Sequence, residues 1–256
     1  YYPDKEEPAD GDNKLYVATR KDYIVPQCGK RSFPWRVTGI FDNDHDILNS
    51  ELIYLLSEDV PKGADYSWIK PGKVLWDWWN DRNIYNVDFK SGINTATYLY
   101  LIDYAAKHNI EYILIDEGWS ARNDLLTLNP EVDIPQICKY AATKGVGVQL
   151  WAKWVNVDRQ LDAAFDQFVK WGVKGVKIDF MDRNDAKMVN FYERVAIKGA
   201  ENKLLIDFHG SYPNEGMRRK YPNLMTREGV VGLEYNKWSK RATVKHDVII
   251  PYLRMW

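Results

Sequence analysis

Apolar, strand-like runs alternate with helix-like segments from about residue 70 onwards, and this alternation restricts the possible folds more than any other feature. Six runs have the strand pattern: residues 74–78, 112–116, 146–151, 175–179, 204–208 and, less regularly, 224–228. The helix-like segments between them are residues 95–108, 134–144, 159–171 and 186–198. Near-continuous apolar strands separated by helices predict a parallel sheet that is covered on both faces.

Residues beside the helix-like segments support these boundaries. Asp133 and Asp158 precede two of the segments, and Asp185 precedes a third, where a carboxylate can cap the first turn. Gly145 and Gly172 follow two segments, where the left-handed conformation that ends a helix favours glycine. The sequence therefore predicts where helices begin and end as well as their number.

Two architectures contain such a sheet, an open doubly wound sheet and a closed barrel. No Gly-rich phosphate-binding turn follows the first strand, where Asn-Asp-Arg-Asn occurs at 80–83, so a nucleotide-binding sheet is disfavoured. Charged residues recur where successive strands end, and a barrel gathers those ends on one face. We therefore predict an α/β fold of the (β/α)8 TIM type. Because six units are visible and a barrel needs eight, we expect it to be incomplete and the chain to be a fragment.

The segment before the barrel has a mixed pattern. Residues 1–13 are acidic and contain proline, so we expect a loop there, and short β-like stretches follow at 15–19 and 36–40. Lys-Pro-Gly at 70–72 marks a boundary between segments. The sequence thus predicts two parts, residues 1–70 and 71–256.

Charge and aromatic content restrict the partners. The chain has 35 Lys and Arg against 36 Asp and Glu, which argues against nucleic acid or an anionic membrane as the main partner. No apolar run approaches the length of a membrane span. Eleven Trp and seventeen Tyr are present, and several stand beside acids, as in Trp-Asp-Trp-Trp at 76–79. Such rings either pack in a core or stack on sugars, whose hydroxyls bind neighbouring carboxylates.

Carboxylates end three of the predicted strands, at Asp116, Asp179 and Asp207. Because a carboxylate is costly to bury among apolar residues, we expect these acids at the mouth of the barrel. Glu228 and Glu234 follow the sixth strand, either converging on the same pocket or remaining solvated in a loop. Each acid taken alone could be structural, but three in register predict a pocket lined by carboxylates.

A pocket of carboxylates, Trp rings and His209 suits hydrolysis of an acetal. That reaction needs one carboxylate to stabilise or trap an oxocarbenium-like centre and one carboxylic acid to protonate the departing oxygen. A Gly-x-Ser-x-Gly elbow and paired zinc-ligand spacings are both absent from the sequence. The residues therefore favour a glycoside hydrolase, with Asp179 as the leading candidate nucleophile.

Four blocks of the chain resemble glycoside hydrolase family 97. They are Ser-Trp-Ile-Lys-Pro-Gly-Lys-Val-Leu-Trp-Asp-Trp-Trp at 67–79, Gly-Val-Lys-Ile-Asp-Phe-Met-Asp-Arg at 175–183, Arg-Lys-Tyr-Pro-Asn-Leu at 219–224 and Arg-Glu-Gly-Val-Val-Gly-Leu-Glu-Tyr-Asn at 227–236. The resemblance implies a calcium-dependent α-glucosidase or α-galactosidase with an N-terminal β-sandwich, a central barrel and a C-terminal β domain. Residues 1–70 would then be the end of the sandwich and a linker, and residues 71–256 part of the barrel.

The resemblance also implies roles for individual residues. Retaining members of the family carry Asp on the fourth strand, which makes Asp179 the nucleophile, whereas inverting members have a glutamate base directly after the His of the fifth strand. Here Gly210 follows His209, so both positions imply retention. Glu234 corresponds to the acid/base and also lies at the calcium, and Glu228 corresponds to a calcium ligand.

Six further residues are expected to bind substrate: Asp116, Glu117, Trp151, Lys153, Asp182 and His209. Trp76 and Trp78, with Trp151, are candidate sugar platforms. The function expected from the resemblance is a retaining, exo-acting α-galactosidase that hydrolyses oligosaccharides by double displacement. The alternatives are an α-glucosidase acting on malto-oligosaccharides and, in another class, a non-catalytic carbohydrate-binding or inactive fragment. The family also implies a periplasmic, cell-envelope or secreted location in a Bacteroides-like bacterium, while the oligomeric state stays open.

Overall fold

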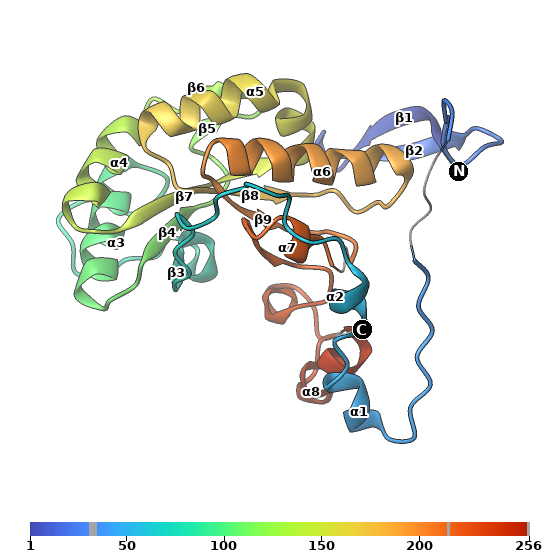
Figure 1. Cartoon of the computed structure of the whole chain (residues 1–256). Helices are drawn as coiled ribbons and strands as arrows, with labels where there is room; N and C mark the ends of the chain where they lie inside the picture. Colours follow the sequence, from blue (N-terminus) through green and yellow to red (C-terminus); the bar gives the residue numbers. More distant parts are fainter. Residues whose placement is uncertain (31–34, 214–215, 255–256) are drawn as a thin grey trace.

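A curled sheet of six parallel strands forms the centre of the molecule. The computed structural model describes residues 1–30, 35–213 and 216–254 (Figure 1). The sheet has the order β10-β9-β8-β7-β4-β3, and every neighbouring pair is parallel. Its strands are β3 (Val74–Trp76), β4 (Tyr112–Ile115), β7 (Gly147–Lys153), β8 (Gly175–Asp179), β9 (Leu205–Phe208) and β10 (Leu224–Arg227). This is an incomplete barrel of the TIM type, and the predicted fold is confirmed.

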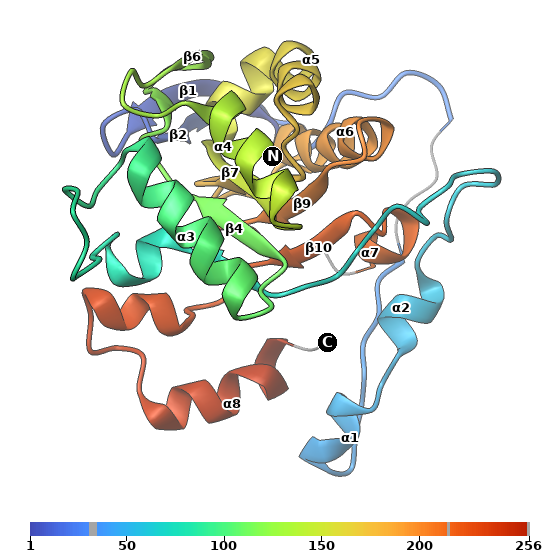
Figure 2. The ribbon, with the colours of Figure 1, turned by 90° about the vertical axis from the view of Figure 1, so that its left-hand side faces the viewer.

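Helices between the strands lie along the outer side of the curve (Figure 2). They are α3 (Thr95–Lys107), α4 (Ile134–Thr143), α5 (Trp154–Trp171) and α6 (Ala186–Glu201). As predicted, Asp133 accepts a hydrogen bond from the Gln136 N–H and caps α4, and Asp185 caps α6 in the same way. Gly172 ends α5 with φ of 91°.

The predicted start of α5 is wrong. We expected Asp158 to cap this helix, but it begins at Trp154, because the buried side chains of Trp154, Val155 and Val157 continue the helix upstream. Asp158 lies inside the helix and its carboxylate is 2.5 Å from Arg194 of α6. The helix departs from regular geometry at Gln160, close to the predicted start.

Side-chain alternation along the strands separates the core from the site. In β8, Val176 and Ile178 belong to the hydrophobic core beneath the helices. Lys177 and Asp179 lie at the alternate positions and face the concave side of the sheet, where they line a cavity. One strand therefore supplies both packing and chemistry.

The first twenty residues form a hairpin. Strand β1 (Pro3–Ala9) pairs in antiparallel register with β2 (Lys14–Arg20), so the loop expected at residues 1–13 is wrong, and the strand expected at 15–19 is confirmed. Cross-strand pairs such as Tyr16 with Glu7, joined by a 2.5 Å hydrogen bond, stabilise strands that are polar and exposed. The β-like stretch expected at 36–40 is not a strand.

Shorter elements connect or flank the barrel. They are α1 (Asp44–Leu48), α2 (Leu52–Leu56), η1 (Asp77–Asn80), β5 (Ser120–Ala121), β6 (Asp124–Leu128), α7 (Met217–Lys220), η2 (Leu233–Lys237) and α8 (Val244–Arg254). Helices α1 and α2 lie before the barrel, and the division at residue 70 stays a prediction. Within the described residues, none of the helices is both long and apolar enough to cross a membrane.

Candidate active site

A cavity of about 1080 Å³ lies at the carboxyl ends of the barrel strands. All but one of the predicted site residues line it: Asp116, Glu117, Trp151, Asp179, Asp182, His209, Glu228 and Glu234. They come from β7, β8 and η2 and from the segments that directly follow β4, β8, β9 and β10. The structure therefore brings together side chains that are up to 118 positions apart in the sequence, from 116 to 234.

Asp179 is buried at the end of β8, and both of its carboxylate oxygens are held. Oδ2 accepts a hydrogen bond from the Trp151 indole N–H at 3.0 Å, and Oδ1 accepts one from the Phe180 backbone N–H at 2.6 Å. Burial favours the neutral acid, but the hydrogen bond and charge of His209, together with the charge of Lys177, outweigh it and lower the pKa of Asp179. The group is thus an oriented carboxylate that stays ionised at neutral pH.

His209 stands between three carboxylates. Its Nδ1 is 3.4 Å from Asp179 Oδ2 and 3.3 Å from Glu228 Oε2, and its Nε2 is 3.6 Å from Glu234 Oε2. Burial lowers the pKa of His209, but the hydrogen bond to Asp179 and the surrounding negative charges raise it overall. The imidazole therefore links the candidate nucleophile to the candidate acid/base.

Glu228, Glu234 and His209 could hold a metal ion. One ligand atom from each lies within 4.8 Å of the others, and theirs is the one such group found in the described part of the chain. Burial raises the pKa of Glu228, and the nearby charges of Glu234 and Asp179 raise it further against the opposing effect of His209. Two carboxylates suit a calcium ion, whose ligands are oxygens, whereas the imidazole is not an oxygen donor.

Lys177 is a site residue that the sequence reasoning missed. This buried lysine lies 3.2 Å from Asp116 Oδ2 and 4.0 Å from Asp179 Oδ2, and its Nζ is 3.9 Å from the centre of the Trp76 ring. Trp76 also donates to Asp116 Oδ2 at 2.5 Å. The available signal was the alternation along β8, which places Lys177 on the same face as Asp179, two positions later.

Asp77 and Arg82 form a buried support that was also missed. Asp77 accepts the Asp116 backbone N–H at 3.0 Å and Arg82 Nε at 2.9 Å. Arg82 in turn donates to the Glu117 carbonyl at 3.1 Å. These contacts fix the end of β4, so Asp116 and Glu117 are presented to the cavity by a braced backbone.

Lys153 is the one predicted site residue that does not line the cavity. Its Nζ donates to Asn123 at 2.8 Å and to the Asp12 carbonyl at 3.2 Å. The turn of the β1–β2 hairpin covers the end of β7, and this cover directs the ammonium group away from the site. The expectation that Lys153 binds a substrate hydroxyl is not supported by this geometry.

Asp207 does not lie at the mouth either. It pairs in register with Lys177, within β9 rather than after it, and lines a smaller cavity of about 300 Å³ on the concave side of the sheet. Burial raises the pKa of Asp207 in spite of the charges of His209 and Lys177. The strand predicted at 204–208 does end at Phe208, so Asp207 lies inside the strand and not beyond its end.

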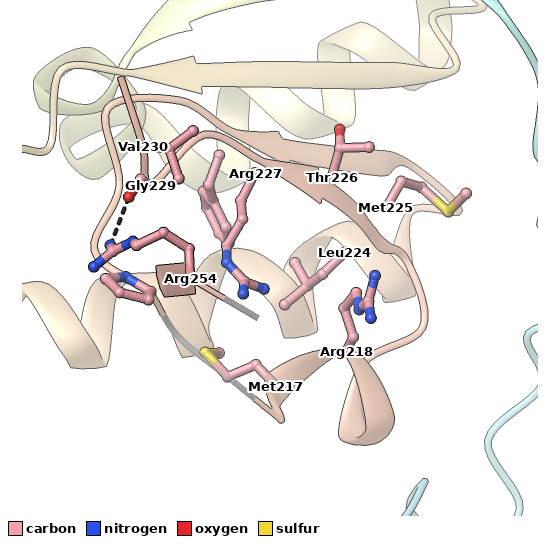
Figure 3. A pocket seen from close by; sticks show the side chains of 11 residues that line it. Met217, Arg218, Leu224, Met225, Thr226, Arg227, Gly229, Val230 and Arg254 are labelled. Atoms are coloured by element: carbon pink, nitrogen blue, oxygen red, sulfur yellow. Dashed lines mark hydrogen bonds between the residues drawn. The ribbon is translucent and has the colours of Figure 1, made fainter. Parts of the chain in front are cut away.

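A further cavity of about 420 Å³ lies beside β10, between α7 and α8 (Figure 3). It is lined by Met217, Arg218, Leu224 and Arg227 among others, and Arg254 donates to the Gly229 carbonyl at 2.6 Å. None of the predicted site residues lines this cavity. The carboxylates that could perform chemistry therefore meet in the larger cavity.

A curled parallel sheet with carboxylates gathered at its carboxyl ends has the architecture of the barrel class, in which active sites lie on this face. The sequence model of the family "Glycoside hydrolase 97" matches residues 78–230 of the chain. The chain therefore belongs to glycoside hydrolase family 97.

Individual relatives agree with this assignment. The retaining alpha-galactosidase of Bacteroides thetaiotaomicron is 42% identical over 245 residues, which are 94% of this chain and 37% of that protein. The probable retaining alpha-galactosidase of Streptomyces bingchenggensis is 32% identical over 244 residues, 91% of this chain and 36% of that protein. The chain thus spans little more than a third of the length of these relatives.

A solved structure has the same fold. A family 97 enzyme from Pseudoalteromonas sp. strain K8, in complex with acarbose, superposes with a TM-score of 0.68 at 27% identity, over 77% of this chain and 35% of that one. A variant of the same enzyme was solved in complex with panose, with the same score and coverage.

Proposed function

We propose that the protein containing this chain is a retaining α-galactosidase that removes terminal α-linked sugars from oligosaccharides. The observation that carries the proposal is the arrangement of Asp179 and Glu234 on either side of His209 in one cavity. Their two environments differ. Asp179 accepts hydrogen bonds from Trp151 and the Phe180 N–H and lies beside His209 Nδ1, whereas Glu234 accepts the Trp78 indole N–H at 2.8 Å and faces His209 Nε2. The names of the Bacteroides and Streptomyces relatives support the galactoside preference.

In the proposed reaction, Asp179 attacks the anomeric carbon and forms a covalent glycosyl-enzyme. Glu234, in its protonated form, transfers its proton to the departing oxygen and then removes a proton from the water that releases the sugar. Trp151 and the Phe180 N–H hold the two oxygens of Asp179, so little reorientation is needed before attack. Each role is performed by a group whose position in the cavity is fixed by neighbours.

The residue after His209 supports retention. Gly210 has φ of 61°, and a Cβ added there would lie 3.0 Å from Asp182 Oδ1 and 3.3 Å from Asp179 Oδ1. A glutamate at this position would crowd the carboxylate of Asp179, so a base at position 210 and the nucleophile Asp179 exclude each other. This chain has Asp179 and no glutamate at position 210. In a retaining mechanism the nucleophile occupies the face of the sugar on which an inverting enzyme needs a base to activate water.

The first test is hydrolysis of nitrophenyl α-galactoside and α-glucoside by the natural full-length protein. We expect faster turnover of the galactoside, with the α anomer of galactose as the first product by NMR. Initial release of the β anomer would overturn retention.

A second candidate function is α-glucosidase activity. It is favoured by the relative solved with acarbose and with panose, a trisaccharide of glucose, and faster turnover of the glucoside would select it. Binding of both sugars without turnover would indicate a carbohydrate-binding protein.

We further propose that the site binds calcium through the carboxylates of Glu228 and Glu234. When bound, the ion would supply positive charge beside the acid/base and an anchor for substrate oxygens. The convergence of the two carboxylates with His209 supports this assignment.

Removal of calcium should lower activity and reduce thermal stability together, because the ion binds the folded state only. We expect chelation to decrease turnover and Tm, and added calcium to restore both. Glu228→Gln should raise the calcium concentration needed for half-maximal stabilisation by about tenfold or more, since it removes one ligand charge. The control is Glu201→Gln, at the exposed end of α6. Activity and Tm that do not respond to chelation would contradict the calcium site.

A further inference from the structure

The segment that follows Asp179 has an unusual backbone. Phe180 and Asp182 adopt φ of 68° and 46°, in the left-handed region that residues with side chains rarely occupy. Such conformations persist only where surrounding contacts hold them, and they concentrate at functional sites. The Phe180 N–H also donates directly to Asp179 Oδ1, so the path of this segment determines how the carboxylate is aimed.

Contacts from three directions hold the segment. The Asp182 N–H donates to the Gly210 carbonyl at 2.8 Å, and the Phe180 ring meets the edge of the Trp151 ring at 5.8 Å. The third contact comes from outside the barrel. Lys14 pairs with the Asp182 carboxylate, and its Nζ lies 5.5 Å from the centre of the Phe180 ring, within reach of a cation–π interaction.

Lys14 is itself held in place by its hairpin. It is the first residue of β2, directly after the turn, and the hairpin lies against the end of α6 (Figure 1). Glu6 of β1 contacts both Arg183 and Lys187 at 2.5 Å, and the turn contributes the Asp12 carbonyl to Lys153. The hairpin, held by these contacts, therefore places the ammonium group of Lys14 at the rim of the cavity.

We propose that Lys14 is a positioning residue for the nucleophile, an inference that rests on the proposed role of Asp179. By neutralising Asp182 and lying over Phe180, Lys14 stabilises the left-handed segment and thereby keeps the Phe180 N–H directed at Asp179. The hairpin before the barrel is then part of the catalytic apparatus. Lys14 acts through the loop and does not transfer a proton or contact the reacting bond.

The test is Lys14→Met in the natural full-length protein, assayed on nitrophenyl α-galactoside. Methionine keeps an unbranched side chain but removes the charge. We expect kcat to fall about 10- to 100-fold, because a small displacement of an attacking group has an effect of this size, with KM changed much less. Lys14→Arg should recover most of the loss, since a cation returns to Asp182. Lys5→Met on the same hairpin is the matched control, because Lys5 pairs with Glu7, at 2.5 Å, on an exposed face away from Asp182.

A double-mutant cycle separates this role from a general structural one. Asp182→Asn and Lys14→Met should each lower kcat at unchanged Tm, and the double variant should be no slower than the slower single variant. An unchanged kcat in Lys14→Met, or a rise in KM alone, would overturn the positioning role. If the unmodified protein fails to hydrolyse either glycoside, the proposed function fails instead, so the two failures are distinguishable.

Discussion

Replacing Asp179 by alanine should lower kcat/KM for an α-galactoside by about 10⁴-fold, equivalent to about 5 kcal/mol in the activation barrier. The loss is expected because the variant has no group in position to form the glycosyl-enzyme. Asp179 is also ionised and oriented, because His209 and Lys177 lower its pKa against the effect of burial, and Trp151 and the Phe180 N–H bind its two oxygens. The measurement is steady-state hydrolysis of nitrophenyl α-galactoside at neutral pH.

Added azide identifies the reason for that loss. The space left by the shortened side chain should admit azide, which can attack the anomeric carbon from the side that Asp179 occupied and give a β-galactosyl azide. Asp103→Ala on α3 is the control, because Asp103 interacts with Lys144 and Tyr140 on the outside of the barrel. Normal activity in Asp179→Ala, with no azide adduct, would remove Asp179 from the mechanism.

The sequence predicted the parts of this site that depend on local pattern. Apolar runs ending in acids placed Asp116 and Asp179 at the carboxyl ends of β4 and β8, and a parallel sheet brings such ends to one edge. The alternation of side chains along β8 also predicts that Lys177 lies on the same face as Asp179. This was missed because Lys177 was treated as part of the apolar run. Where the position of a side chain depends on one strand and its register, the sequence is sufficient to predict that it reaches the site.

Contacts between segments far apart in the chain could not be predicted from the local sequence pattern. Lys14 meets Asp182 across 168 positions, and nothing in an exposed, polar hairpin indicates that its turn covers the end of β7. That same turn takes Lys153 away from the cavity. Asp207 was misplaced for a different reason: the strand end at residue 208 was predicted correctly, but the acid one position earlier was treated as the residue that ends the strand, whereas it pairs with Lys177 within the sheet.

Glu234→Gln should produce a loss that depends on the leaving group. For galactosides whose leaving oxygen needs a proton, we expect kcat/KM to fall by about 10³-fold, within the range that general acid catalysis contributes. For dinitrophenyl galactoside the loss should be far smaller, because that phenolate departs without a proton. Glutamine keeps an oxygen that can face a cation and an acceptor for the Trp78 indole N–H, so the packing should survive.

The second step of the reaction gives Glu234 a signature that differs from that of Asp179. Water must be deprotonated to release the sugar, so Glu234→Gln should accumulate glycosyl-enzyme and show a burst of dinitrophenolate. Azide needs no deprotonation and should relieve this block with an α-galactosyl azide, the opposite anomer to the one expected for Asp179→Ala. Glu201→Gln, exposed on α6, is the control. An equal loss for every leaving group would mean that Glu234 acts through substrate or metal binding alone. Because both variants lose a carboxylate from one cavity, only the anomer of the azide product assigns the two groups to opposite faces of the sugar.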